Sequence, residues 1–322
     1  MSEIEEKYDV IVVGGGAAGL SGALALSRAR RSVLVIDAGD PRNAPAGHIH
    51  NYLGRESTPP LELVAIGRTE VEGYGGTVTQ GKVASTTRTD DGFRLELTDG
   101  RTVAGRKLLV ATGLIDKLPD IAGLAERWGQ DVLHCPYCHG WEVRDQAIGI
   151  VATTPMAIHQ ALMWRQWSDD VTLFLNGAFE PTHDEYEQLA AREVSVVDGV
   201  VAAIESAGDK LTGVRLADGH VIARDALVVA PKFMARTDVL TDLGLVPVEL
   251  GMGDVVVGTH FESDPMGGTA VPGVWVAGNV TDLMATVIVS AAGGAKAAMA
   301  ISAEFIADDT RAAVAARQVS IA

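Results

Sequence analysis

The stretch YDVIVVGGGAAG, residues 8–19, decides the fold that this sequence predicts. It has the pattern of a buried, β-rich strand that runs into a glycine-rich turn, and helical apolar spacing follows over Leu20 to Arg30. A second apolar strand, Val33 to Ile36, ends at Asp37, 23 residues after the first glycine of the turn. This order of strand, G-x-G-x-x-G turn, helix, strand and acid predicts a βαβ unit that binds a dinucleotide.

Each glycine of the predicted turn has its own physical reason. Gly14 allows the tight turn, Gly16 lets the backbone approach a pyrophosphate, and Gly19 lets the helix meet the strand. The amino terminus of the helix then faces the phosphates, and Asp37 would accept hydrogen bonds from a ribose. The alternative is an ordinary glycine turn in a βαβ unit that holds no ligand.

Length and composition are those of a glycine-punctuated α/β protein. The chain has 322 residues, enough for two domains, and it is 47% apolar with 36 glycines. A net charge of −16 disfavours nucleic acid and anionic membrane surfaces as partners. The acidic first six residues predict no signal peptide, and the glycine-broken apolar runs predict no membrane span.

The same plan occurs twice along the chain. Leu95–Gly100 followed by Leu108–Ala111 matches Val214–Gly219 followed by Leu227–Ala230, at an offset of 119 throughout. We therefore predict an α/β fold with two Rossmann-like domains, doubly wound and three-layered, the second inserted in the first. The predicted bounds are residues 1–115 for the first part of the first domain, 116–243 for the inserted domain, and 244–322 for the second part of the first domain.

The turn of the second copy is altered at the positions that a nucleotide needs. In Ala152-Thr153-Thr154-Pro155-Met156-Ala157, alanine replaces the first glycine and a β-branched threonine replaces the second. Thr154 places a side chain where a bare backbone should approach a pyrophosphate, and Pro155 removes an N–H at the helix start. The next strand, Val171 to Leu175, ends in Asn176-Gly177, without an arginine for a 2′-phosphate. The second copy is therefore predicted to keep the fold and to have lost the nucleotide.

The chain has only two cysteines, and both belong to Cys135-Pro136-Tyr137-Cys138-His139-Gly140. Thiols at C-x-x-C spacing can close and reopen a disulfide, which predicts a redox dithiol. The alternatives are a zinc site and inert core cysteines. A four-ligand zinc site lacks ligands in a chain without a second C-x-x-C, although His134 and His139 flank the pair. A single dithiol in a chain without other cysteines fits the cytosol, so we expect a cytoplasmic protein.

A long loop rich in Pro, Gly, His and Asn is predicted from Asp40 to Pro60, before a helix over Leu61 to Tyr74. Loops of this length in compact domains are usually functional or disordered. The loop contains His48 and His50, which either serve the site or are incidental histidines of a solvated loop.

The last third of the chain returns to the first domain. Val274–Gly278 is another strand that ends in a glycine turn, and Asn279 after it either binds a cofactor hydroxyl or only serves the turn. Ala285 to Ile306 is Ala/Gly-rich and helical, which allows close packing, and a frayed tail is expected from Thr310.

With its motifs in this order, the chain resembles low-molecular-weight thioredoxin reductase over essentially its whole length. The landmarks are the turn at residues 14–19, Ala111-Thr112-Gly113, Cys135-x-x-Cys138, and Ala277-Gly278-Asn279 where the family has Ala-Gly-Asp. The resemblance implies a homodimer in which the first and last segments bind FAD and the middle segment, the NADPH domain of the family, carries the dithiol beside the flavin. No metal is expected, and the implied FAD-binding residues are Gly14, Gly15, Gly16, Ala17, Ala18, Gly19, Asp37, Ala38, Asn51, Val83, Ala111, Thr112, Gly113, Gly278, Asn279 and Val287.

Three departures separate the chain from the reductases. The NADPH glycines are absent, Leu175-Asn176-Gly177 replaces the basic motif for the 2′-phosphate, and His139 replaces the acid that follows the second cysteine. These features resemble the flavin-dependent dithiol oxidases of the gliotoxin and holomycin type, where C-x-x-C-H is typical. The resemblance implies an enzyme that closes a disulfide in a small natural-product dithiol and passes the electrons to O2, which yields H2O2.

The resemblance also assigns the two cysteines: Cys135 faces the substrate, and Cys138 lies nearest the flavin. His139 suits the role of base, because free thiols with a pKa near 8.5 are mostly protonated at neutral pH whereas histidine titrates near pH 6.5. His139 as a mere helix cap is the alternative, and His134 either supports the site or is structural. Two rival functions remain: a thioredoxin reductase that uses NADPH or another reductant such as ferredoxin, and a non-enzymatic flavin-binding or redox-sensing protein.

Overall fold

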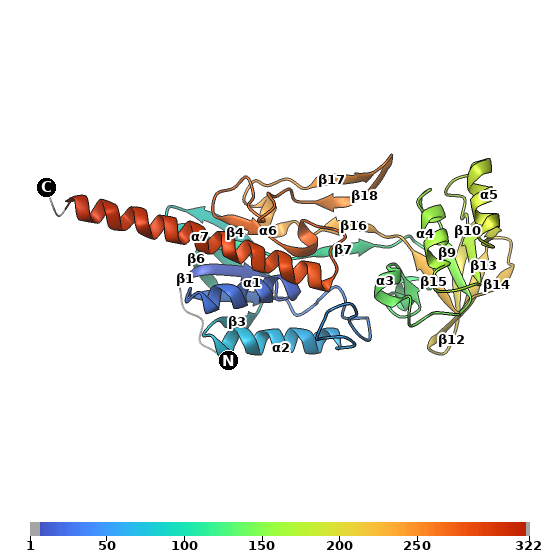
Figure 1. The fold of residues 1–322 in the computed structure, drawn as a ribbon, viewed down its shortest axis with the longest axis horizontal. Coiled ribbons are helices and arrows are strands. Elements are labelled where there is room, and N and C mark those ends of the chain that lie inside the picture. The colour runs from blue at the N-terminus through green and yellow to red at the C-terminus, as the bar shows by residue number, and fades with distance from the viewer. Residues whose placement is uncertain (1–6, 320–322) are drawn as a thin grey trace.

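The computed structural model describes residues 7–319 and shows two lobes joined by a pair of strands (Figure 1). The larger lobe holds both ends of the described chain, and the smaller lobe is formed by the middle of the sequence. The acidic first six residues, from which we predicted the absence of a signal peptide, lie outside the described residues.

The larger lobe is built on a seven-stranded sheet in the order β3-β2-β1-β6-β5-β4, with β19 paired to β6. Strands β3, β2, β1, β6 and β19 run parallel, whereas β5 and β4 extend the sheet as an antiparallel meander. The bounds are β1 Lys7–Val13, β2 Val33–Asp37, β3 Thr77–Gln80, β4 Val83–Thr89, β5 Gly92–Leu97, β6 Thr102–Val110 and β19 Val274–Val276. The glycine-rich stretch therefore lies at the carboxyl end of the central strand, where such sheets bind ligands.

Strand β1 is buried on both faces from Val10 to Val13, which is why this part is continuously apolar. Its alternate side chains enter two separate cores: Val10 and Val12 pack on one side, and Ile11 and Val13 pack on the other. The first core is closed by three helices, α1 (Ala17–Arg28), α2 (Pro60–Gly73) and α7 (Val287–Val319). The second is closed by the β4–β5 meander and the short α6 (Asp238–Thr241).

The smaller lobe repeats this plan with a five-stranded parallel sheet in the order β11-β10-β9-β15-β8. Two helices pack on one face, and a three-stranded antiparallel sheet, β12-β13-β14, packs on the other. The bounds are β8 Val132–Leu133, β9 Ile148–Val151, α4 Ala157–Trp164, β10 Val171–Phe174, α5 His183–Ala191, β11 Ser195–Val197, β12 Val201–Ala207, β13 Lys210–Leu216, β14 Val221–Ala223 and β15 Ala226–Val229, with the 3₁₀ turn η1 Ala125–Arg127 and α3 Pro136–His139 before β9. The core order β11-β10-β9-β15 matches β3-β2-β1-β6, so the predicted pair of Rossmann-like domains is confirmed.

The chain passes between the lobes along β7 (Leu114–Lys117) and returns along β16 (Lys232–Ala235), and the two strands pair antiparallel. They extend a four-stranded sheet with β17 (Val248–Met252) and β18 (Val255–His260). Ala235, Val239 and Leu240 already belong to a core of the larger lobe. This packing favours a return crossing at β16, earlier than residue 243, and the domain bounds stay a prediction.

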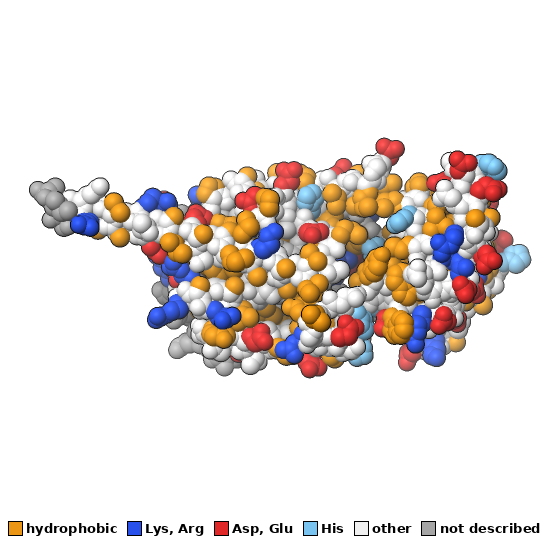
Figure 2. All heavy atoms as spheres, viewed as in Figure 1, with side chains coloured by type: hydrophobic (Ala, Val, Ile, Leu, Met, Phe, Trp, Pro, Cys, Tyr) orange, Lys and Arg blue, Asp and Glu red, His pale blue; other side chains and the backbone are white. Residues whose placement is uncertain are grey.

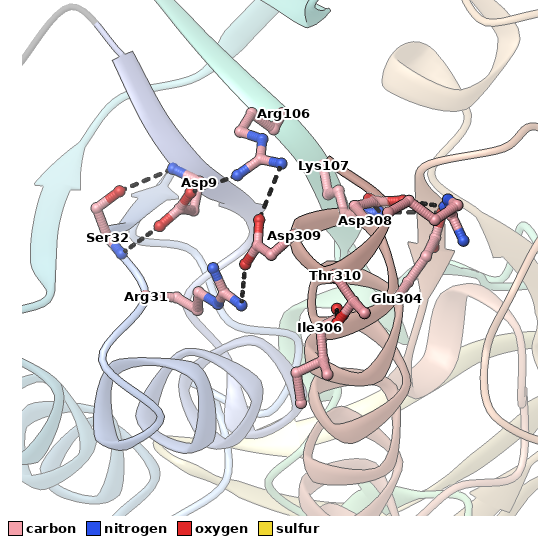
Figure 3. A network of polar contacts seen from close by, with 11 residues as sticks. Asp9, Arg31, Ser32, Arg106, Lys107, Glu304, Ile306, Asp308, Asp309 and Thr310 are labelled. Atoms are coloured by element: carbon pink, nitrogen blue, oxygen red, sulfur yellow. Dashed lines mark hydrogen bonds and ion pairs between the residues drawn. The ribbon is translucent and has the colours of Figure 1, made fainter. Parts of the chain in front are cut away.

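The expectation of a frayed tail from Thr310 is wrong, because α7 continues to Val319. Figure 3 shows ion pairs that tie the turns just before Thr310 to the rest of the larger lobe. Asp309 lies 3.0 Å from Arg31, and buried Lys107 lies 3.0 Å from Glu304 and 3.1 Å from Asp308. The last turns of α7 project beyond the lobe, as Figures 1 and 2 show.

Helix α7 is long and apolar enough to cross a membrane by length and composition alone, with a mean hydropathy of 1.2 over an 18-residue window. In the structure, however, Ala297, Ile301 and Phe305 are almost fully buried in the first core of the larger lobe. The packing against α1 is close, because a Cβ on Gly294 would lie 1.8 Å from the carbonyl oxygen of Ala18. These contacts are those of a core helix in a folded domain.

Candidate active site

A cavity of about 560 Å³ lies where the two lobes meet. Its walls come from the glycine-rich turn, the loop after β2, the start of β7, the dithiol segment and the turn before α7. Figure 2 shows hydrophobic side chains gathered where the lobes face each other. Every predicted FAD-binding residue except Gly19 lines this cavity. Their roles as ligands stay a prediction.

The glycine-rich turn has the shape that a pyrophosphate needs. Gly14 has a φ of +105°, and a Cβ there would lie 2.3 Å from the carbonyl oxygen of Ala111. A Cβ on Gly16 would meet nothing within 4 Å, so the space beside this residue is open. Among the described residues, no side chain caps α1 at Gly16, which leaves the first N–H groups of the helix available to an anion.

Gly19 does not line the cavity, and its role is packing. A Cβ at this position would lie 1.8 Å from the carbonyl oxygen of Gly14. Only glycine lets α1 approach β1 this closely, which is the role that the motif predicted.

Asp37 ends β2 at the edge of the cavity, as predicted for a ribose acceptor. Its Oδ1 accepts a hydrogen bond from the Gly15 N–H at 3.1 Å, and its Oδ2 accepts one from Arg68 of α2. The sequence analysis missed Arg68, because no motif marks a helical arginine 31 residues after the acid. The two contacts hold the carboxylate in place.

Arg42 and Asp116 form a second ion pair that the sequence analysis missed. Arg42 donates from Nε and Nη2 to the two oxygens of Asp116, each at 2.7 Å. Its Nη1 lies 3.4 Å from Oδ1 of Asn279, and its guanidinium stacks over Phe233. All four residues line the cavity, so a fixed positive charge faces the dithiol. Arg42 lies in the loop that was singled out by its length, but Asp116 has no local signal.

Asn279 serves the turn before α7, which was the alternative to a cofactor contact. Its Nδ2 donates to the carbonyl oxygens of Ala285 at 2.9 Å and of Asp282 at 3.0 Å. Its Oδ1 faces Arg42. The side chain also lines the cavity, so the two roles are compatible.

Cys135 and Cys138 are free thiols at the start and in the middle of α3, and both line the cavity. Figure 1 places α3 on the side of the smaller lobe that faces the larger one. A hydrogen bond from the Cys138 thiol outweighs burial and lowers the pKa of Cys135 to about 7, with help from backbone N–H groups and from Arg42. The same hydrogen bond raises the pKa of Cys138. Cys135 therefore holds the thiolate, and Cys138 keeps its proton.

His139, the last residue of α3, lines the same cavity. Its Nε2 is buried and has no hydrogen-bond partner among the described residues. Burial lowers the pKa of the ring, although the charge of Glu142 opposes this effect. The imidazole is therefore neutral at neutral pH, and its Nε2 has no partner among the described residues, so the ring can accept a proton as a general base does.

The other candidate histidines differ from His139. Burial, together with Arg42, lowers the pKa of His134 to about 4, and its ring packs edge-on against Phe233 at 5.2 Å. His50 has a carboxylate at each ring nitrogen, Glu56 at 2.6 Å and Glu142 at 3.3 Å. His48 lines the cavity 6.4 Å from His50, measured between ring centres. Within residues 7–319, no group of three or more His, Cys, Asp or Glu side chains could hold a metal ion.

The altered turn of the smaller lobe is closed by its own polar groups. Asn176, one residue beyond the position that the strand register matches to Asp37, donates to the carbonyl oxygen of Ala152 at 3.2 Å and accepts from the Val201 N–H at 2.9 Å. The Thr153 hydroxyl lies 3.3 Å from the carbonyl oxygen of Ala230. Buried Leu175 stands where Asp37 stands in the larger lobe, and the first polar side chain after this strand is bonded inside the domain.

Comparisons with known proteins agree with this site. Thioredoxin reductase tcpT of Claviceps purpurea is 32% identical over 320 residues, which cover 93% of this chain and 95% of the relative. Thioredoxin reductase aclD of Aspergillus oryzae is 31% identical over 315 residues, covering 94% and 98%. The crystal structure of HlmI is 43% identical with a TM-score of 0.91, covering 100% of this chain and 99% of that one.

The family model for pyridine nucleotide-disulphide oxidoreductases matches residues 8–296, most of the chain. The open glycine turn, the free helix terminus and the paired acid fit the FAD that this family binds. The predictions of a thioredoxin reductase-like flavoprotein and of FAD as cofactor are confirmed. The chain belongs to the pyridine nucleotide-disulphide oxidoreductase family and is a thioredoxin reductase-like, FAD-dependent disulfide oxidoreductase.

Proposed function

We propose that this enzyme is a dithiol oxidase that closes a disulfide in a small-molecule natural product, with O2 as the electron acceptor and H2O2 as the second product. The observation that carries the proposal is His139: a neutral ring with a buried, unpartnered Nε2, in one cavity with Cys135 and Cys138. Bound FAD would supply the two-electron chemistry that links the dithiol to O2. The likeness to HlmI supports the same choice.

The two cysteines and His139 account for the thiol chemistry. Starting from the Cys135–Cys138 disulfide, His139 takes the proton of a substrate thiol, and the thiolate attacks Cys135 Sγ. The bond between the two cysteines breaks and leaves its electron pair on Cys138. The second substrate thiolate then attacks the substrate sulfur of the mixed disulfide and releases the Cys135 thiolate. Cys135 suits this leaving role, because its pKa is lowered to about 7.

The smaller lobe supports a cycle without nicotinamide. Thr154 and Pro155 occupy the turn, and Asn176 is committed to Ala152 and Val201. We propose that this lobe places the dithiol against the cofactor cavity and binds no NADPH. Electrons then enter from the dithiol substrate.

The alternative function is thioredoxin reductase with NADPH or another reductant such as ferredoxin. The names of the two relatives favour this alternative, because both are called thioredoxin reductases. The direction of electron flow separates the two functions, since a reductase passes electrons from the flavin to the dithiol. A flavin-binding or redox-sensing protein would show no catalytic electron transfer in either direction.

We further propose a cytoplasmic homodimer that uses the outer face of α7. Ile288, Met299, Ile306 and Val314 are exposed along this helix at spacings of 11, 7 and 8 residues, close to three, two and two helical turns. A solution mass measured at micromolar concentration tests the dimer, and a monomer would contradict it.

Anaerobic titration of the yellow protein tests the function. One sample receives NADPH, a second a small dithiol, and the flavin absorbance is followed. We expect the dithiol to bleach the flavin and NADPH to leave it unchanged. Air should then restore the colour with one H2O2 per disulfide formed. Bleaching by NADPH alone would establish the reductase instead.

A further inference from the structure

The loop between β2 and α2 touches the smaller lobe at several points, although it belongs to the larger lobe. Asn51 Nδ2 donates to the carbonyl oxygen of Tyr137, inside the C-x-x-C segment, at 2.6 Å. His50 Nε2 lies 3.3 Å from Glu142, three residues beyond His139. The loop also packs on Gly129, where a Cβ would lie 2.9 Å from Pro45. The two sides of the dithiol segment are thus held from outside their own domain.

One carboxylate organises both of these polar contacts. Glu56 Oε1 lies 2.6 Å from His50 Nδ1, and Glu56 Oε2 accepts a hydrogen bond from the Asn51 N–H at 2.9 Å. Asn51 has a φ of +58°, a left-handed conformation that needs local support. Glu56 supplies that support, so one side chain fixes the backbone of Asn51 and the ring of His50 together.

The loop is closed by backbone hydrogen bonds and anchored by a buried side chain, so its residues can hold the dithiol segment in a fixed position. Ile49 is buried, and its N–H donates to the Thr58 carbonyl oxygen at 2.8 Å, while the Ser57 N–H donates back to Ile49 at 3.0 Å. His50, Asn51 and Glu56 lie on the short hairpin that these bonds close. The hydrogen bond from His50 also lowers the pKa of Glu56, which keeps this carboxylate charged.

We propose that Glu56, His50 and Asn51 form a clasp that positions the dithiol segment against the cofactor cavity. Glu56 and His50 are positioning residues in this proposal, which rests on the proposed function only for its effect on turnover. The clasp holds Tyr137 and Glu142, on either side of Cys138 and His139. Opening it frees the segment from the loop and exposes the thiols to solvent.

Labelling of the two thiols tests the clasp without any turnover. The chain contains no other cysteine, so every label reports on this site. The FAD-loaded protein is reduced by a phosphine without oxygen and treated with iodoacetamide, and mass spectrometry follows the labelling. For Glu56→Gln and His50→Gln we expect labelling about fivefold faster, the effect of losing one net hydrogen bond from the closed state.

Two further variants separate positioning from a loss of charge or of fold. Glu70→Gln removes the same charge from an exposed residue of α2 and should label at the parental rate. His50→Lys places a hydrogen-bond donor between Glu56 and Glu142 and should restore most of the shielding. Bound FAD, measured by its visible absorbance, should stay at the parental level in all four variants.

Parental labelling rates in both Glu56→Gln and His50→Gln, with FAD retained, would overturn the clasp. If Glu56→Gln fails to fold or to hold FAD, His50→Gln and Glu142→Gln decide the question by the same criterion. The proposed function has a separate readout: without dithiol-dependent H2O2 from the parental protein it fails, and the labelling pattern still supports the clasp.

Discussion

The two glycine-turn regions of this chain share the same framework of strands but differ at the positions that a nucleotide needs. Both follow the central strand of a parallel sheet with the same core order, and both strands, β1 and β9, are buried. Beside Gly16 the space is open, whereas Thr154 stands at the matching position. Asp37 lines the cofactor cavity, whereas Asn176 is bonded inside its own domain. Packing therefore maintains the fold of a Rossmann-like domain, and a few turn atoms decide whether it binds a nucleotide.

Transferring the second turn to the first should have the largest effect. Gly16 has a φ of −81° and a ψ of −172°, which any residue adopts, and no protein atom would clash with a Cβ. Gly16→Thr should therefore fold normally, yet fill the space meant for the pyrophosphate. We expect a colourless protein without dithiol oxidase activity, checked by flavin absorbance and by circular dichroism.

Gly19→Ala is the matched control for this substitution. Its Cβ would lie 1.8 Å from the Gly14 carbonyl oxygen, so it should lower the melting temperature, at a cost of about 1–3 kcal/mol of stability. If Gly16→Thr binds FAD as the parent does, the turn is not the cofactor site.

His139→Ala should have the next largest effect, because it removes the proposed general base from the smaller lobe and leaves the fold of that lobe intact. We expect dithiol oxidation at pH 7 to slow by about 10²–10⁴-fold, the usual contribution of a general base. The loss should shrink at high pH, where substrate thiols ionise unaided. Steady-state oxygen consumption across the pH range measures both effects.

The exposed His159 of α4 provides the comparison, and His159→Ala should oxidise dithiols at the parental rate. A helix cap would lower the stability of His139→Ala at every pH and would show no recovery at high pH. Parental activity of His139→Ala at pH 7 would move the base to His134 or to the His48–His50 loop.

Removing the Cys138 thiol should have a moderate effect, which is a change in the pKa of Cys135. Removing the Cys138 thiol takes away the main cause that lowers the pKa of Cys135, and burial, which raises it, remains. In the reduced parent, iodoacetamide labelling of Cys135 should therefore rise through a midpoint near pH 7. In Cys138→Ala the midpoint should move up by about one pH unit or more.

Cys138→Ser is the control here, because its hydroxyl can still donate to the Cys135 thiolate, and it should shift the midpoint less. An unchanged midpoint in Cys138→Ala would assign the low pKa to Arg42 and the backbone instead.

The last variant, Thr154→Gly, is expected to have no effect on flavin reduction by NADPH. Thr154→Gly restores one glycine to the second turn, but Pro155 and the bonds of Asn176 remain. Neither the parent nor this variant should show flavin reduction by micromolar NADPH under anaerobic conditions. Reduction within seconds in the parent would contradict the proposed loss of nicotinamide.

The framework and the dithiol were predictable from sequence because their signals are local. Residues Val10 to Val13 of strand β1 have to be apolar because both faces are buried there, and Gly14, Gly16 and Gly19 each meet a steric requirement of the turn. The repeat at an offset of 119 then predicted the second domain, since similar strands and turns form the same unit. The tail from Thr310 was mispredicted, because it continues a helix whose preceding turns are held by partners distant in sequence, such as Arg31 for Asp309.

The sequence by itself determined the two Rossmann-like domains, the cofactor turn, and a histidine beside the redox cysteines. Only the tertiary structure brought Arg42 to Asp116 and the Glu56 loop to Tyr137 and Glu142. Those pairs join residues from two lobes or from segments far apart in the chain, and each residue alone looks like an ordinary surface charge or loop polar group. Their significance arises from proximity, which strand and helix periodicity cannot encode.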